Sequence, residues 1–422
     1  MKNILFCVIL LFKAQLILAQ HAPVLQAETV AAAYNQNRPD ELYRMMSTEM
    51  QSAISKTASD QLFAQLMSQL GEIKNITKVS AEIAEMQSYR LSFAQPVVDI
   101  MLMIQGSKIV GLRQVAKEIP PENSLQSKSP DNYGIREGEK RIYATLQLPH
   151  SAKAVPVVLL IAGSGSTDRN MNQGNALLTN SFSMLADTLA AHGIATVRYD
   201  KRGVGKSIAA LENKLPTMDD YGSDAAAFIK ELKDDKRFSK VFVIGHSEGS
   251  GIAIIAAKKT PPFAFISLNG YDSDLLTVLR RQLETVLDQN DLKLAKTIVD
   301  SLHHDKFYRG EISPSLNSIF NLPAQQYLMT ARHHQAKDEI KQLSMPILII
   351  GGTSDLQIST EQVTNLSKSC PDAQLSIIQG MNHVLKDAPI SREENLKTYQ
   401  SPQLKINTEL GNTIVRFIHK FP

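Results

Sequence analysis

A serine lies between two glycines at the point where an apolar run gives way to small residues. Residues 245–249 read Gly-His-Ser-Glu-Gly, and they follow the apolar residues 241–244 and precede a helix-like run at 250–258. A strand, a sharp turn and a helix in this order form a nucleophile elbow, whose strained turn leaves room only for small residues two positions either side of the serine. The pattern predicts that Ser247 is a nucleophile.

A serine hydroxyl needs a base, usually an imidazole that is itself held by a carboxylate. Two later loops supply these groups: Gly-Gly-Thr-Ser-Asp ends at Asp355, and Gln-Gly-Met-Asn-His ends at His383. Each loop follows an apolar run typical of a strand, and a parallel sheet gathers its ligands at the carboxyl ends of its strands. We therefore expect His383 to be the general base and Asp355 to orient it, with Asp272 and Asp274 as alternative acids.

Acyl transfer also requires hydrogen-bond donors for the tetrahedral oxyanion. The backbone N–H of Glu248, directly after the serine, is the first expected donor. The second is expected from the loop after the first central strand, where residues 163–166 read Gly-Ser-Gly-Ser and let the backbone approach a substrate. Ser164 is the preferred donor of this loop, and Gly165 is the alternative.

Two further patterns suggest other chemistry but lack essential residues. The Gly-Lys-Ser at residues 205–207 resembles part of a phosphate loop, yet Asp200 stands where that motif needs glycine. Adjacent histidines at 303–304 and 333–334 point to different faces of a helix, unlike a metal-binding pair four residues apart. We expect neither a metal nor an organic cofactor.

The elements around these residues alternate between strands and helices, which indicates a parallel sheet with helices on both faces. A first strand is expected at 141–148, and the interval 271–342 is too long for one crossover. Its leucines recur at helical spacing, so we predict a helical cap there. The near-continuous apolar strands are expected at 155–162, 194–199, 241–244, 263–268, 347–350 and 375–378.

The first third of the chain has a different pattern. Helical spacing between residues 28 and 70 gives way to alternation between 76 and 116, which predicts a small α+β accessory domain at 21–118. A Pro- and Ser-rich stretch marks a linker at 119–133, and the larger domain follows at 134–422. The accessory domain holds no cluster of residues at catalytic or ligand spacing, so we expect a structural or binding role.

The chain begins with Lys2 and an apolar stretch that Lys13 divides into two runs, each too short to span a bilayer. This indicates a cleaved signal peptide at residues 1–19, export to a periplasm or out of the cell, and no stable membrane anchor. Cys7 and Cys370 are the two cysteines of the sequence, so the mature chain cannot form an internal disulfide. The formal net charge of +3 gives no electrostatic case for nucleic-acid binding.

With these motifs the chain, over about residues 135 to 420, resembles the α/β-hydrolase superfamily, whose members share the order Ser, Asp, His. It looks most similar to the serine aminopeptidase-like and dienelactone-hydrolase-like branch, and the layout of the small domain resembles a domain of unknown function in exported bacterial hydrolases. The resemblance implies an α/β-hydrolase sheet, and it gives Asp200 and Arg202 a structural role. The motifs that carry it are Ala-Gly-Ser-Gly at 162–165 with Asp-Arg at 168–169, the stretch 200–207, the elbow, and residues 352–355 and 382–383.

These features predict a serine hydrolase that cleaves small or medium carboxylic esters through an acyl-enzyme. A peptidase that acts on short peptides is the alternative, and it would need an acidic anchor for the substrate amine. Asp272, Asp274 and Glu284 are candidates for that anchor. A non-catalytic binding protein is a third hypothesis, which is weakened because all three catalytic residue types are present.

Overall fold

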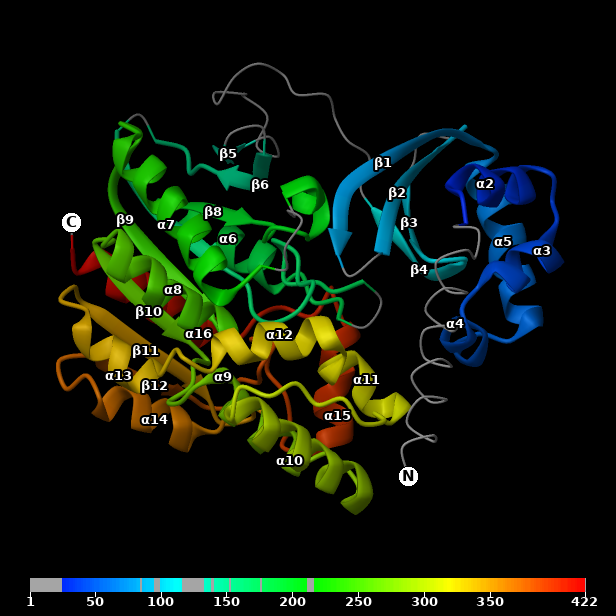
Figure 1. Ribbon diagram of the computed structural model, residues 1–422. Coiled ribbons are helices and arrows are strands. Elements are labelled where there is room, and N and C mark those ends of the chain that lie inside the picture. Colours follow the sequence, from blue (N-terminus) through cyan, green and yellow to red (C-terminus); the bar gives the residue numbers. More distant parts are fainter. Residues whose placement is uncertain are drawn as a thin grey trace. The chain divides into compact units, whose positions relative to one another are not determined.

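The computed structural model describes residues 25–83, 86–94, 99–115, 133–137, 140–151, 153–174, 177–210 and 216–421. The chain divides into two compact units, one with the elements before residue 120 and the other with those from β5 onward. In Figure 1 the first unit runs from blue to cyan and the second from green to red. The proposed signal peptide at 1–19 and the predicted linker, except Tyr133, lie outside the described residues.

In its described residues the first unit packs four helices on a four-stranded antiparallel sheet in the order β1-β2-β3-β4. Ile100, Leu102 and Ile104 alternate along β3 and are all buried in the core of this unit, as the period of two predicts. Gly106 turns the chain from β3 into β4 with a φ of 57°. The elements are α2 (Ala27–Asn35), α3 (Pro39–Met45), α4 (Thr48–Ala53), α5 (Lys56–Leu70), β1 (Ile73–Ile83), β2 (Met86–Phe93), β3 (Asp99–Gln105) and β4 (Lys108–Val115).

The second unit is built on an eight-stranded sheet in the order β12-β11-β10-β9-β7-β8-β6-β5. The strands from β7 to β12 pair in parallel, and β6 pairs antiparallel with β8. This is the expected α/β-hydrolase sheet. Strand β6 corresponds to the strand expected at 141–148. The strands are β5 (Tyr133–Glu137), β6 (Lys140–Gln147), β7 (Val155–Ile161), β8 (Ala195–Tyr199), β9 (Phe238–His246), β10 (Ala264–Leu268), β11 (Ile347–Gly352) and β12 (Gln374–Ile378).

Helices cover both faces of this sheet, which is why its central strands are apolar throughout. Along β7, Val157 and Leu159 enter the core beneath one set of helices, and Val158 and Leu160 enter the core on the opposite face. Figure 1 shows α7 and α8 together beside the sheet. One face carries α7 (Met218–Asp234), α8 (Glu248–Lys259) and α14 (Thr360–Lys368), and the other carries α6 (Ser181–Ala191) and α16 (Thr408–His419).

A helical insertion lies between β10 and β11 and forms the cap. Its first two helices match the predicted leucine periodicity. Leu276, Leu283, Ile298 and Leu302 are buried together in a separate apolar core. The insertion contains α9 (Leu275–Glu284), α10 (Gln289–His303), α11 (Pro314–Phe320), α12 (Leu322–Ala331) and α13 (Ala336–Glu339), and α15 (Arg392–Lys397) follows β12.

Strand β5 was not predicted. Tyr133, the last residue of the predicted linker, begins this five-residue strand, which pairs antiparallel with β6. An edge strand this short carries too few alternating positions to stand out in a sequence.

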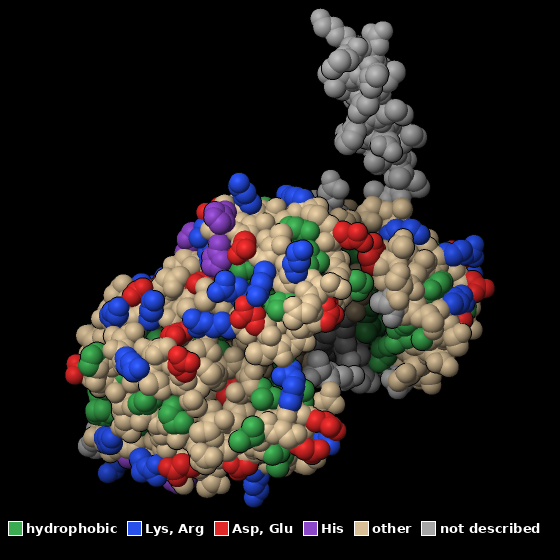
Figure 2. Space-filling model, turned by 90° about the horizontal axis from the view of Figure 1, so that it is seen from below, with side chains coloured by type: hydrophobic (Ala, Val, Ile, Leu, Met, Phe, Trp, Pro, Cys, Tyr) green, Lys and Arg blue, Asp and Glu red, His purple; other side chains and the backbone are tan. Residues whose placement is uncertain are grey.

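Within the described residues no helix is both long and apolar enough to cross a membrane. Figure 2 shows Lys and Arg interspersed with Asp and Glu on the face it displays, in keeping with the small net charge.

Candidate active site

Ser247 lies at the turn between β9 and α8. Its φ of 54° and ψ of −122° are unusual for a residue with a side chain, as a nucleophile elbow requires. Close contacts with backbone atoms require glycine at both flanking positions, 245 and 249. A Cβ on Gly245 would overlap the carbonyl of Gly249, and a Cβ on Gly249 would overlap the carbonyl of Ile161 in β7. The tight turn therefore positions the serine at the carboxyl edge of the sheet.

We expect Gly249→Ala to lower the free energy of unfolding by about 1–3 kcal/mol, because the added methyl group meets rigid backbone. Denaturant unfolding measures this change. Gly411→Ala is the matched control, since the nearest atom there is a side-chain methyl group of Thr188 at 2.9 Å and not backbone, and alanine favours the helix by about 1 kcal/mol. Equal losses in the two variants would contradict the packing argument.

His383 and Asp355 lie on the loops after β12 and β11, and their side chains meet. The Nδ1 atom of His383 lies 2.8 Å from Oδ2 of Asp355, and both side chains are buried. The other carboxylate oxygen, Oδ1, accepts hydrogen bonds from the backbone N–H groups of Gln357 at 2.7 Å and Ile358 at 2.9 Å. These bonds fix the carboxylate, which holds the imidazole through its Nδ1 atom. The other ring nitrogen, Nε2, is not in contact with Asp355.

The two alternative acids are occupied elsewhere. Asp272 accepts a hydrogen bond from Nη1 of Arg281 at 2.7 Å and another from Asn365 at 3.3 Å. Asp274 caps the N-terminus of α9 through the backbone N–H of Thr277 at 3.0 Å. The geometry therefore pairs His383 with Asp355 and with neither of these residues.

His246, beside the serine, supports the loop that carries His383. Its Nε2 atom lies 2.8 Å from the backbone oxygen of His383, and its ring packs edge-on against Phe182. Burial lowers the pKa of His246 well below its ordinary value, and the nearby His383 lowers it further. The neutral ring donates to the carbonyl and so holds the loop that carries His383.

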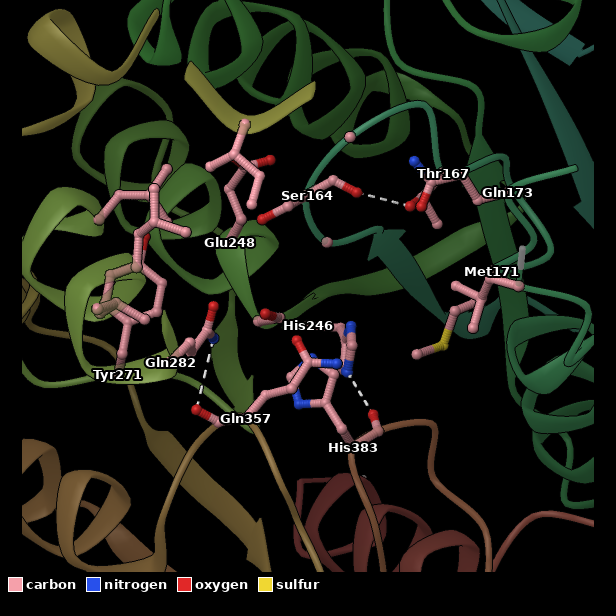
Figure 3. Close-up of a pocket in the computed structure, with 18 of the residues that line it drawn as sticks. Ser164, Thr167, Met171, Gln173, His246, Glu248, Tyr271, Gln282, Gln357 and His383 are labelled. Carbon is pink, nitrogen blue, oxygen red and sulfur yellow. Dashed lines mark hydrogen bonds between the residues drawn. The ribbon is translucent and has the colours of Figure 1, made fainter. Parts of the chain in front are cut away.

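The glycine-rich loop after β7 approaches the serine closely. A Cβ on Gly163 would lie 3.2 Å from Cβ of Ser247, so glycine lets this backbone approach Ser247 closely. The next residue, Ser164, lines the same cavity as the serine, and its carbonyl accepts a hydrogen bond from the Thr167 hydroxyl at 2.7 Å (Figure 3). Both expected oxyanion donors, Ser164 and Glu248, therefore border one cavity with Ser247.

Two residues of this region escaped the sequence analysis. Lys201 is fully buried, and its Nζ atom donates to the Gly163 carbonyl at 2.6 Å and to Oε2 of Glu248 at 3.1 Å. The Tyr327 hydroxyl donates to Oε1 of the same Glu248 at 2.9 Å. Lys201 follows the strand 194–199 by two residues, in a loop where lysine is ordinarily exposed, so the sequence carries no signal of its burial.

The residues on either side of Lys201 have structural roles. Asp200 accepts hydrogen bonds from the backbone N–H of Arg169 at 2.9 Å and from that of Lys206, also at 2.9 Å. Arg202 forms a buried ion pair with Asp224 on α7 at 2.5 Å. These bonds fix the loop after β8 beneath the site, as the resemblance implies.

A cavity of about 520 Å³ opens above Ser247 and is closed on one side by the cap. The cap supplies mostly apolar side chains, among them Leu275, Leu279 and Ile319. At the lower edge Gln282 of α9 donates to the Gln357 carbonyl at 3.4 Å, which joins the cap to the loop of Asp355 (Figure 3). The cavity suits a largely uncharged group of small or medium size.

Comparison with known proteins places this geometry in context. A family model described as "Serine aminopeptidase, S33" matches residues 173–387. The esterase EstD of Thermotoga maritima is 24% identical over 358 residues, which cover 81% of this chain and 82% of that protein. An uncharacterised protein of Mycobacterium tuberculosis is 22% identical and covers 54% of this chain and 70% of its own length.

Two solved structures also align with this chain. Est1E from Butyrivibrio proteoclasticus with bound ferulic acid aligns with a TM-score of 0.44 at 18% identity, and the alignment covers 66% of this chain and 95% of Est1E. An esterase from Thermogutta terrifontis aligns with a TM-score of 0.40 at 17% identity, covering 66% of this chain and 94% of the esterase.

Proposed function

The chain belongs to the serine aminopeptidase S33 family of α/β-hydrolases, and from this premise we propose that it hydrolyses carboxylic esters through an acyl-enzyme on Ser247. The observation that carries the proposal is the buried contact of 2.8 Å between His383 and Asp355, on loops that meet the serine elbow at one cavity. An imidazole fixed by a carboxylate beside a serine on a strained turn is an arrangement that activates a hydroxyl.

In the proposed reaction Ser247 Oγ attacks the ester carbonyl while Nε2 of His383 takes the serine proton. The carbonyl oxygen becomes an oxyanion that accepts hydrogen bonds from the backbone N–H groups of Glu248 and Ser164. Collapse of this intermediate breaks the bond to the leaving alcohol, which takes the proton from His383. Water, deprotonated by the same histidine, then attacks the acyl-enzyme and releases the acid and the free serine. Asp355 holds the imidazole in the required tautomer throughout.

The charges around the cavity favour esters over peptides with a free amino terminus. An aminopeptidase needs a carboxylate to bind the substrate ammonium group, and among the described residues that line the cavity Glu248 supplies the one carboxylate. That carboxylate already binds Lys201 and Tyr327. The acids considered as anchors from sequence do not line this cavity, and each has another partner: Asp272 with Arg281, Asp274 with Thr277, and Glu284 with Lys296.

The apolar wall supplied by the cap indicates an uncharged acyl group of medium length. Burial of one methylene group contributes about 0.8 kcal/mol, which corresponds to an increase in kcat/KM of about fourfold for each added carbon. This increase should stop when the acyl chain fills the cavity. The relative from Thermotoga maritima bears the name esterase, which supports the same substrate class for this chain.

A series of p-nitrophenyl esters from acetate to laurate, run beside aminoacyl anilides, tests the proposal. We expect fluorophosphonate labelling of the wild-type protein, and a kcat/KM that rises with chain length by up to about fourfold per carbon and then falls. Butyrate and hemisuccinate esters form a matched pair, of which the uncharged one should be the better substrate.

Faster cleavage of the anilides than of every ester would assign the protein to the peptidases, for which its family description is the supporting observation. Failure of the fluorophosphonate to label the folded protein would instead support the non-catalytic hypothesis.

A further inference from the structure

A buried ion pair lies directly behind the two expected oxyanion donors. Lys201 and Glu248 are separated by 3.1 Å between Nζ and Oε2, and their side chains are 1% and 3% exposed. Removing two charges from water costs several kcal/mol for each ion, and the attraction between them often fails to compensate for this cost. Such a pair is therefore expected to contribute little to the stability of the fold. Its position against the backbone of the site indicates another role.

The lysine fixes the orientation of one particular peptide group. Its Nζ atom donates to the carbonyl oxygen of Gly163 at 2.6 Å. In a trans peptide the C=O of one residue and the N–H of the next point in opposite directions. The N–H of Ser164 belongs to the same peptide group as this carbonyl, so it is turned away from Lys201. Gly163 and Ser164 line the cavity whereas Lys201 is buried behind them, so this N–H faces the cavity.

The same ammonium group also holds the residue that supplies the other donor. Glu248 provides its backbone N–H at the first position of α8, and its side chain turns back to Lys201. The second oxygen of that carboxylate accepts the hydroxyl of Tyr327 from α12 of the cap. Lys201 therefore joins the glycine-rich loop to the start of α8, and Glu248 extends this connection to the cap. All three hydrogen bonds involve a charged group, and such bonds are about twice as strong as neutral ones.

We propose that Lys201 is a positioning residue for the oxyanion site: it orients the Ser164 N–H through the Gly163 carbonyl and fixes Glu248 beside it. This inference rests on the proposed ester hydrolysis. Because the Glu248 carboxylate balances the ammonium charge, Lys201 acts by aligning the two donors and not by adding net positive charge to the cavity. Its contribution belongs to the transition state, in which the oxyanion exists, and not to the binding of the neutral ester.

The test must separate this role from simple loss of an ion pair. Lys201→Met alone leaves the Glu248 carboxylate buried without its cation, which is strongly destabilising. The variant of choice is therefore Lys201→Met combined with Glu248→Gln, which removes both charges and keeps an oxygen for Tyr327. The matched control is Lys258→Met combined with Glu339→Gln, which removes a Lys–Glu pair of nearly the same separation, 3.2 Å, from the other end of α8.

We expect the Lys201→Met/Glu248→Gln protein to fold, as measured by its circular dichroism and melting, and to lose about 10–100-fold in kcat, part of what removal of a whole oxyanion donor costs. KM for the best ester should stay within about twofold, because ground-state binding is unaffected. Inhibition by a trifluoromethyl ketone, whose adduct carries an oxyanion, should weaken by the same factor as kcat. The Lys258→Met/Glu339→Gln control should keep its kcat within about threefold.

A second variant keeps the proposal testable if the methionine protein does not fold. Lys201→Gln with Glu248→Gln retains an amide donor near the Gly163 carbonyl, so its kcat should fall below that of the wild type by less than the loss of a whole oxyanion donor, with KM within about twofold. Wild-type kcat in either folded variant, or equal losses in the control pair, would overturn the proposal. Lack of labelling and turnover in the wild-type protein would instead refute the proposed ester hydrolysis itself.

Discussion

Ser247→Ala is expected to lower kcat for the best ester by about 10⁶-fold, because the acyl-enzyme can no longer form. The fold should persist, since alanine also carries a Cβ and the two glycines that accommodate the turn remain. KM should change little, because the hydroxyl contributes to bond making and little to binding of the ester. Initial rates with p-nitrophenyl esters, fluorophosphonate labelling and thermal unfolding measure these three effects.

Ser223→Ala is a suitable control for this experiment. Ser223 is exposed on α7, where its hydroxyl donates to the Asp219 carbonyl at 2.8 Å. The control should be labelled and should turn over as the wild type does. Stoichiometric labelling that persists in Ser247→Ala would place the nucleophile at another residue, and the elbow would then be only a structural turn.

The sheet and the placement of the three catalytic candidates were predictable from sequence. Ser247, Asp355 and His383 each follow an apolar run, and runs of that kind form parallel strands when both faces are covered. Parallel strands end at a common edge, so residues far apart in sequence meet there. The elbow is also local, since the glycines that it requires lie two residues from the serine.

The network around Lys201 was not predictable in the same way. Tyr327 comes from the cap and lies 79 positions after Glu248. The leucine periodicity of the cap identifies its helices but does not indicate which cap side chains reach the cavity, because that depends on how the insertion returns to the sheet. The choice between Asp355 and the earlier acids, Asp272 and Asp274, also depended on the structure, because all three follow strands.

Asp355→Asn is the second change with a large expected effect, about 10⁴-fold in kcat. The reason lies in the two hydrogen bonds that the carboxylate accepts from backbone N–H groups of Gln357 and Ile358, both through Oδ1. The asparagine oxygen must take that place, so its NH₂ group faces Nδ1 of His383. Nδ1 then has to accept a hydrogen bond, and the ring proton moves to Nε2. A protonated Nε2 cannot take the proton of Ser247.

The substitution Asp355→Asn thus impairs proton transfer from Ser247 and leaves folding and substrate binding intact. KM and the unfolding midpoint of Asp355→Asn should therefore stay near the wild-type values while kcat falls. Asp272→Asn is the control, because Asp272 follows an earlier strand yet pairs with Arg281 and Asn365; its kcat should stay within about threefold of the wild type. A larger loss in Asp272→Asn than in Asp355→Asn would mean that the catalytic acid is Asp272 and that the contact of 2.8 Å does not govern the imidazole.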